Sequence, residues 1–97
     1  MRRYEVMVIH RPELQEAEVQ AKVKEIETLL ETRGVTIAET DLWGKRRFAY
    51  EIDHIHEGYY SVVQFDGEPA LVDTLDRALS LADNVVRHKI LRIDQDK

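Results

Sequence analysis

Three adjacent cations, Lys45, Arg46 and Arg47, are the residues whose types and spacing most favour a specific chemistry. They repel one another and are costly to desolvate, so their adjacency calls for a compensating partner. The phosphates of a polyanion would supply that partner. The simpler interpretation is the solvated end of a β-strand, and for an isolated triplet it ranks first. The rest of the chain must decide between the two.

Other basic residues gather at two further places, although the chain as a whole is acidic. Its formal net charge is −5, which argues against a general nucleic-acid-binding protein. Six glutamates lie within residues 13–31, whereas arginines occupy positions 2 and 3 and a third basic group lies within residues 87–92. Charge segregated in this way can give an acidic protein a locally positive surface.

Histidine chemistry is a second possibility. His54 and His56 would lie on the same side of an extended segment, and His10 and His88 complete the set. No other residue at ligand spacing accompanies them, and the chain has no cysteine. Surface histidines in a turn therefore explain the pair better than a metal site does. We expect neither a metal nor a cofactor.

Signals for catalysis are weak. Acidic residues are plentiful, but no pair sits in a context that would perturb a pKa, and no Ser-His-Asp arrangement is evident. An acylphosphatase-like enzyme would need an anion-binding loop after the first strand, where residues 10–13 read His-Arg-Pro-Glu. A ligand-sensing domain would need a longer turn than Asp83-Asn84. Both stay as the weaker alternative.

Base stacking of the RNA-recognition-motif type is also disfavoured. Residues 57–64 share a glycine, a first aromatic residue and a valine with that motif. They lack its leading basic residue and its later aromatic residues. Trp43, the one tryptophan, is more often a packing residue than a stacking platform.

Hydrophobic periodicity predicts the elements that position these residues. Period-two alternation predicts strands, and Gly44 predicts a bulge or kink that swings the cations away from the packed sheet. Apolar spacings of three and four predict two helices, one beginning near Pro12 and ending at Gly34, the other starting at residues 67–69. The expected strands are residues 4–9, 35–52, 59–65 and 85–93, with a turn at residues 53–58.

This order is that of the split β-α-β, or ferredoxin-like, α+β domain. Right-handed crossovers place both helices on one face of a four-stranded antiparallel sheet and leave the other face open. The first and last strands are then neighbours, and residues 35–52 form the opposite edge, with a face able to pack a core through Phe48, Tyr50 and Ile52. The predicted core residues are Val6, Val8, Ile26, Leu30, Ile37, Leu75 and Leu79.

Length and composition fit one domain spanning residues 1–97. Charges interrupt the N-terminal apolar run too early for a signal peptide, and no segment is long and apolar enough to span a bilayer. The sequence therefore predicts a soluble, cytoplasmic protein without a membrane partner.

Four blocks of sequence carry a more specific signal. They read Met-Arg-Arg-Tyr-Glu-Val at residues 1–6, Gly-Lys-Arg-Arg-Phe-Ala-Tyr-Glu-Ile at residues 44–52, Gly-Tyr-Tyr at residues 58–60, and Leu-Ala-Asp-Asn-Val-Val-Arg-His at residues 81–88. In this order and at this spacing they resemble the family of bacterial small ribosomal subunit protein six. The resemblance runs from Met1 to about Ile93.

The resemblance implies a structural, non-enzymatic component of the small ribosomal subunit, without a cofactor or small-molecule substrate. It also implies that the chain binds small-subunit ribosomal RNA in the central domain, together with ribosomal protein eighteen of that subunit. Contact is expected through phosphates and RNA shape rather than base sequence. The candidate RNA-binding residues are Arg2, Arg3, Lys45, Arg46, Arg47, Arg87, Lys89 and Arg92.

The C-terminus departs mildly from that family. Family members often carry an acidic or disordered tail, whereas this sequence stops at Asp94-Gln95-Asp96-Lys97. Roles that depend on such a tail are therefore not carried over to this chain.

Overall fold

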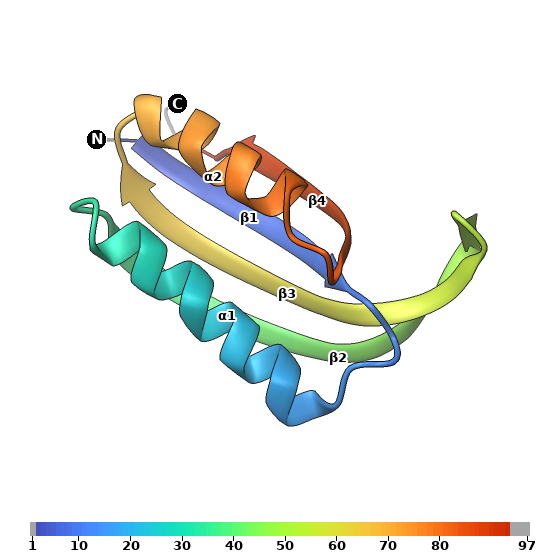
Figure 1. Cartoon of the computed structure of the whole chain (residues 1–97). Helices are drawn as coiled ribbons and strands as arrows, with labels where there is room; N and C mark the ends of the chain where they lie inside the picture. The colour runs from blue at the N-terminus through green and yellow to red at the C-terminus, as the bar shows by residue number, and fades with distance from the viewer. Residues whose placement is uncertain (1, 94–97) are drawn as a thin grey trace.

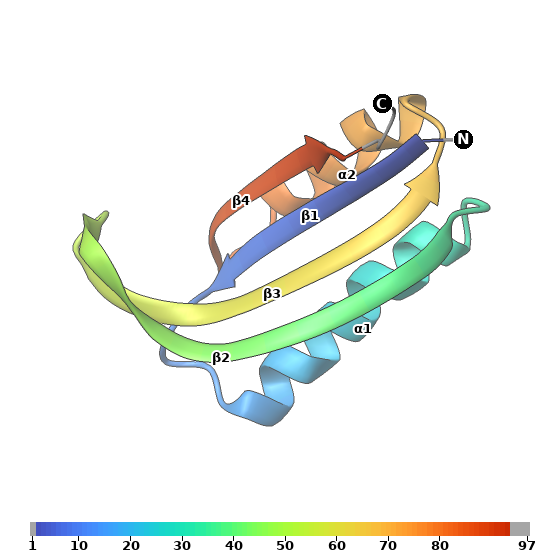
Figure 2. The ribbon, with the colours of Figure 1, turned by 180° about the vertical axis from the view of Figure 1, so that it is seen from behind.

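The computed structural model describes residues 2–93, and within them the helices and strands follow the predicted order. The strands form one antiparallel sheet in the order β2-β3-β1-β4, with both helices on the same face (Figure 1). The other face is open (Figure 2), so the ferredoxin-like fold is confirmed. The elements are β1 (Arg2–His10), α1 (Glu16–Glu31), β2 (Thr36–Ile52), β3 (Ile55–Gly67), α2 (Ala70–Ser80) and β4 (Val85–Arg92). The C-terminal residues 94–97 lie outside the described residues.

Helix α1 begins later than predicted. The backbone N–H of Gln15 donates a hydrogen bond to the Glu18 carboxylate at 2.7 Å, which fixes the first turn of the helix there. Glu16 and Glu18 also place negative charge at the positive end of the helix dipole. Pro12 therefore lies in the preceding turn. The predicted end is correct, because Gly34 adopts a positive φ of 83° just beyond the helix.

The turn between β2 and β3 is shorter than predicted. Asp53 and His54 have positive φ values of 51° and 66°, as the two central residues of a tight type I′ hairpin turn require. Strand β3 then resumes at Ile55 instead of Tyr59. His56 and Glu57 are polar, so the apolar pattern of the sequence does not indicate this part of the strand.

Strands β2 and β3 are much longer than their neighbours. They span 17 and 13 residues, against 9 for β1 and 8 for β4, and continue past them as a curved hairpin (Figures 1 and 2). The prediction that Phe48, Tyr50 and Ile52 could pack a core is wrong for this reason. Neither helix reaches that far, and Tyr50 leaves 76% of its surface exposed.

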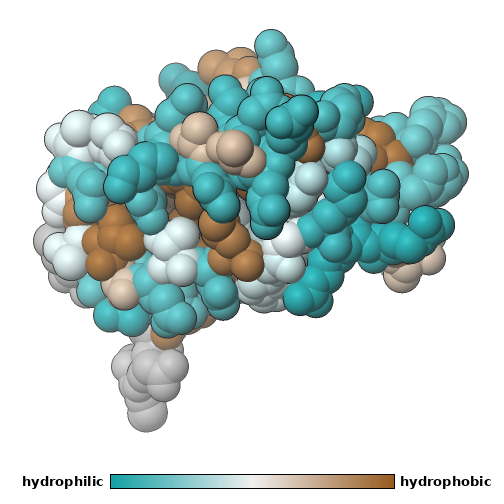
Figure 3. All heavy atoms as spheres, turned by 90° about the horizontal axis from the view of Figure 1, so that it is seen from below, coloured by the Kyte–Doolittle hydropathy of each residue, from teal (hydrophilic) through white to brown (hydrophobic). Residues whose placement is uncertain are grey.

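The core fills the space between the helices and the covered face of the sheet. Val6, Val8 and Phe65 are almost fully buried, and the Tyr4 and Phe65 rings lie 5.7 Å apart. All the predicted core residues are buried except Ile37, which packs against the core but is only half-buried. Seen from below, the outer surface is mainly hydrophilic, with separate apolar patches (Figure 3). Neither helix within residues 2–93 is long and apolar enough to cross a membrane.

Candidate nucleic-acid interface

A bulge at Gly44 separates the basic triplet from the regular part of strand β2. Gly44 has a φ of 86°, and the β2–β3 register shifts between Leu42 and Gly44. Both observations confirm the predicted irregularity. Beyond the bulge, Lys45 pairs with Tyr59, a residue that packs against the core, so Lys45 lies toward the helix-covered side. Arg46, the next residue, points to the opposite side.

Each of these two cations lies against an aromatic ring. The Lys45 Nζ atom is 5.2 Å from the centroid of the Tyr59 ring. The Arg46 Cζ atom is 5.3 Å from the centroid of the Trp43 ring. Cation–π contacts of this kind hold a charged group in place without neutralising it. Both cations therefore remain able to attract an anion.

Trp43 belongs to an exposed aromatic cluster and not to the core. Its ring stacks on Tyr60 with centroids 5.7 Å apart and an interplanar angle of 10°. Phe48 meets Tyr60 edge-on at 6.2 Å. Tyr60 pairs with Ile9, so the cluster lies on the helix-free face of the sheet. Trp43 keeps 39% of its surface exposed, and a simple packing role does not describe it.

The curved hairpin brings Arg47 close to strand β4, a proximity that the sequence pattern did not reveal. Arg47 and Arg87 line one hollow of about 420 Å³ together with Tyr60. Two carboxylates, Glu51 and Asp53, line it as well. The hollow therefore has mixed charge, and within it only the two arginines could bind a phosphate. We call Lys45, Arg46, Arg47 and Arg87 the hairpin group.

Three of the four remaining candidates lie at the other end of the sheet. Arg2 opens β1 and Arg92 closes β4, which run antiparallel, so these two residues occupy the same end as Arg3. We call Arg2, Arg3 and Arg92 the terminal group. Lys89 lies between the two groups and pairs with Met7 on the helix-free face. The structure therefore divides the eight candidates instead of merging them into one patch.

Arg3 already has an ion-pair partner. Its Nε and Nη2 atoms donate to the two carboxylate oxygens of Asp66 at 2.5 and 3.0 Å. The hydrogen bond to Asp66 raises the pKa of Arg3 above its ordinary value. This two-pronged pair joins β1 to β3 and orients the guanidinium. Contact between Arg3 and RNA stays a prediction.

The four histidines do not gather at one place. His54 and His56 both lie near Glu51, with nitrogen-to-oxygen distances of 3.3 and 3.9 Å, and His88 bonds Asp76 at 2.8 Å. Across residues 2–93, no three histidine or acidic side chains converge in an arrangement that could hold a metal ion. The expectation that this chain uses no metal stays a prediction.

His10 has a structural position that the sequence analysis overlooked. It is 1% exposed, and its Nε2 atom forms a 2.8 Å hydrogen bond with the Ser61 hydroxyl inside the domain. Burial lowers the pKa of His10 to about 4. The signal was present, because His10 continues the buried alternation of Val6 and Val8.

Known proteins resemble this chain over nearly its whole length. Residues 3–92 match the family model described as ribosomal protein S6. Small ribosomal subunit protein bS6 of Symbiobacterium thermophilum is 49% identical over 95% of this chain and 97% of its own length. The bS6 of Desulforamulus reducens is 46% identical over the same shares. This chain belongs to the ribosomal protein S6 family.

A solved S6 structure has the same fold. The crystal structure of 30S ribosomal protein S6 from Thermotoga maritima superposes with a TM-score of 0.90 and 29% identity, covering 95% of this chain and 87% of that one. Membership of the S6 family makes the chain a structural component of the small ribosomal subunit and not an enzyme. The acylphosphatase-like alternative is thereby removed.

Proposed function

We propose that this S6-family chain binds small-subunit ribosomal RNA in the central domain, in the bacterial cytoplasm, together with ribosomal protein eighteen. The observation that carries the proposal is the hairpin group. Lys45, Arg46 and Arg47 lie where the β2–β3 hairpin begins to extend past the end of β1, and two of them rest on aromatic rings. Cations presented in this way can reach phosphates that the body of an acidic domain would repel.

The two groups suit a folded RNA rather than a base sequence. Arginine and lysine contacts to phosphates fix the position of a protein without reading bases. The hairpin group and the terminal group lie at opposite ends of the sheet, so they would contact separate parts of an RNA junction. Lys89, between them, would add a further phosphate contact. Recognition would depend on the shape of the RNA.

The partner protein is proposed to occupy part of the helix-free face. Apolar side chains are exposed there, including Trp43 and Leu91 at 39% and 42%. Exposed apolar groups beside charged ones are typical of protein interfaces. A net charge of −5 also weakens binding to RNA by this chain alone, so a basic partner would supply much of the affinity.

Cooperative assembly is the first expected result. In a gel-shift titration of central-domain RNA, this chain and protein eighteen together should bind at lower concentration than protein eighteen alone. Each protein would cover part of the other's surface and would hold the other's cations against the RNA phosphates. The two binding events are therefore coupled. Equal binding by the pair and by protein eighteen alone would show that the assembly role is wrong.

Removal of the hairpin arginines is the second expected result. The double variant Arg46→Ala/Arg47→Ala should weaken assembly and lower the slope of log affinity against log salt by about one unit per lost phosphate contact. Its thermal stability should change little, since an exposed cation–π contact contributes about 0.5–1 kcal/mol.

The matched control removes the same charge elsewhere. Arg33 and Arg77 are exposed on the helix side of the domain, away from the hairpin. Arg33→Ala/Arg77→Ala should retain the wild-type salt slope. If the hairpin variant assembles with wild-type affinity across the salt series, or loses stability without a change of slope, the arginines are structural and do not hold phosphates.

A further inference from the structure

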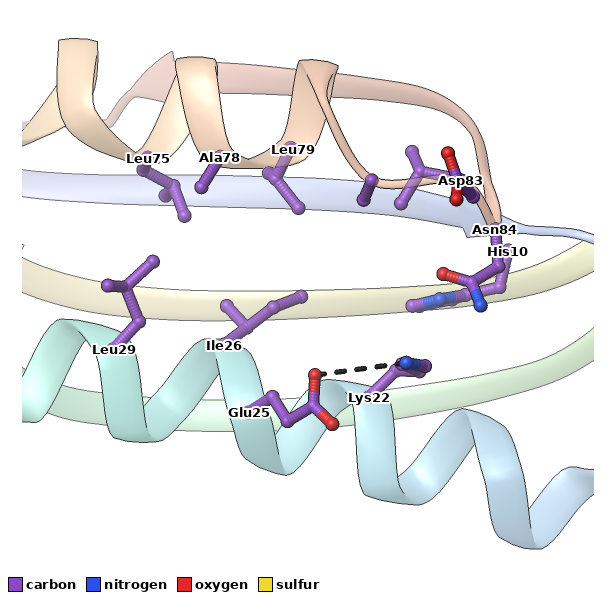
Figure 4. A pocket seen from close by; sticks show the side chains of 12 residues that line it. His10, Lys22, Glu25, Ile26, Leu29, Leu75, Ala78, Leu79, Asp83 and Asn84 are labelled. Atoms are coloured by element: carbon purple, nitrogen blue, oxygen red, sulfur yellow. Dashed lines mark ion pairs between the residues drawn. The ribbon is translucent and has the colours of Figure 1, made fainter.

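An apolar groove of about 360 Å³ lies between α1 and α2, on the side of the sheet away from Trp43. Figure 4 shows side chains from both helices directed toward it. Leu75, Leu79 and Ile26 form its buried floor, while Leu29 is half-buried and Ala78 is exposed at its mouth. The volume falls within the range of roughly 300–1,000 Å³ found for clefts that hold ligands.

Acidic residues predominate on both helices that border this groove. Helix α1 carries five glutamates against two lysines, and α2 carries two aspartates against one arginine. Glu25 and Asp83 line the groove itself. Lys22 also lines it, with its Nζ atom 3.9 Å from a Glu25 carboxylate oxygen (Figure 4), so these three charged residues together carry one net negative charge. The rim is therefore negative above an apolar floor.

We infer that the α1–α2 groove is a docking site for a basic amphipathic helix of a partner protein. Such a helix lays apolar side chains, spaced three and four residues apart, into a hydrophobic groove. Here they would contact Leu29, Ala78 and Leu79. Lysine or arginine side chains along its flanks would face Glu25 and Asp83 and steer the encounter.

Charge complementarity selects this occupant over two others. RNA phosphates would be repelled by the acidic helices, and so would a second copy of this acidic chain. The exposed Leu81, immediately after α2, leaves 76% of its surface available to extend an apolar contact. The groove lies on the helix-covered side of the sheet, opposite Trp43 and Arg46, and its lining includes no residue of the hairpin group. Docking here therefore does not depend on the RNA binding proposed above.

A synthetic peptide tests the inference on the whole chain. The probe is a fluorescein-labelled helix of leucine and lysine, about 15 residues and so about four turns long. Its binding is followed by fluorescence anisotropy, and its position by the amide chemical shifts of the isotope-labelled protein. Shifts are expected at Leu29, Ala78 and Asp83, with Trp43 and Arg46 unchanged.

Two variants with the same change of charge distinguish binding in the groove from general attraction of the peptide to an acidic protein. Ala78→Arg places a bulky cation at the mouth of the groove and should raise the Kd of the peptide at least about tenfold. Ala17→Arg makes the same change at an exposed α1 position outside the groove, and should change the Kd less than about twofold. Both sites are exposed and helical, where arginine is well tolerated.

A second pair keeps the test independent of steric effects. Glu25→Gln/Asp83→Asn should weaken binding of the peptide and reduce the dependence of its Kd on salt concentration. Glu31→Gln/Asp73→Asn removes the same charge elsewhere and should have a much smaller effect on both. The inference is overturned if the two arginine variants weaken binding equally, or if a scrambled peptide of the same composition binds as tightly. It is equally overturned if no binding is seen at about 1 mM peptide.

Discussion

Leu75→Ala is expected to lower the free energy of unfolding by about 2–5 kcal/mol. Leu75 is 1% exposed and lies between α2 and the sheet, so the truncation removes buried methyl groups and leaves a cavity that the domain closes only partly. A loss of this size is a large share of the total stability of a small domain. Ile26→Ala, on the facing helix, should cost a similar amount.

Urea denaturation followed by circular dichroism measures this loss. The matched control is Leu81→Ala, the same chemical change at a leucine that is 76% exposed, which should stay within about 0.5 kcal/mol of wild type. An equally small effect for both Leu75→Ala and Ile26→Ala would mean that the helices present other faces to the sheet.

Much of the fold was predictable because local patterns agreed with the global arrangement. The stripe of Val19, Val23, Ile26 and Leu30 requires one buried helix face, and the alternation of Val6 and Val8 requires one buried strand face. Gly44 marked its own bulge, since a positive φ is costly for residues with a Cβ atom.

What the sequence could not show are the consequences of strand length and curvature. Alternation at Phe48 and Tyr50 looks the same whether or not helices cover that part of the strand. The hollow shared by Arg47 and Arg87 arises only because the long hairpin curves toward β4. The local sequence around Arg47 or Arg87 does not predict that they lie close together, because they are distant in the chain and on strands that do not pair.

His10 illustrates a signal that was present but conflicted with a general rule. Histidine is less often fully buried than valine or leucine, so a place at the end of a buried alternation does not by itself predict its burial. The hydrogen bond to Ser61 removes the conflict, since a neutral, bonded imidazole can be buried at modest cost. That burial has a consequence for stability in acid.

Stability is expected to fall as the pH drops from about 6.5 toward about 4, and His10 should account for roughly 3 kcal/mol of the loss. The pKa of His10 is about 4 in the folded domain, against an ordinary value of 6.5. Between these values the unfolded chain binds a proton that the folded domain excludes. The contribution is therefore complete above pH 6.5 and is lost as the pH falls through the folded-state pKa.

Urea titrations at a series of pH values, compared between variants, isolate this contribution from that of the carboxylates. His10→Gln keeps a hydrogen-bonding side chain near Ser61 but cannot take up the proton, so its stability should fall less steeply between pH 6.5 and 4 than that of wild type. His54→Gln alters a histidine whose side chain is 96% exposed and should reproduce the wild-type profile. Because the carboxylates are the same in all three proteins, their titration cancels in the differences. Parallel profiles for wild type and His10→Gln would show that the folded domain binds the His10 proton as readily as the unfolded chain does.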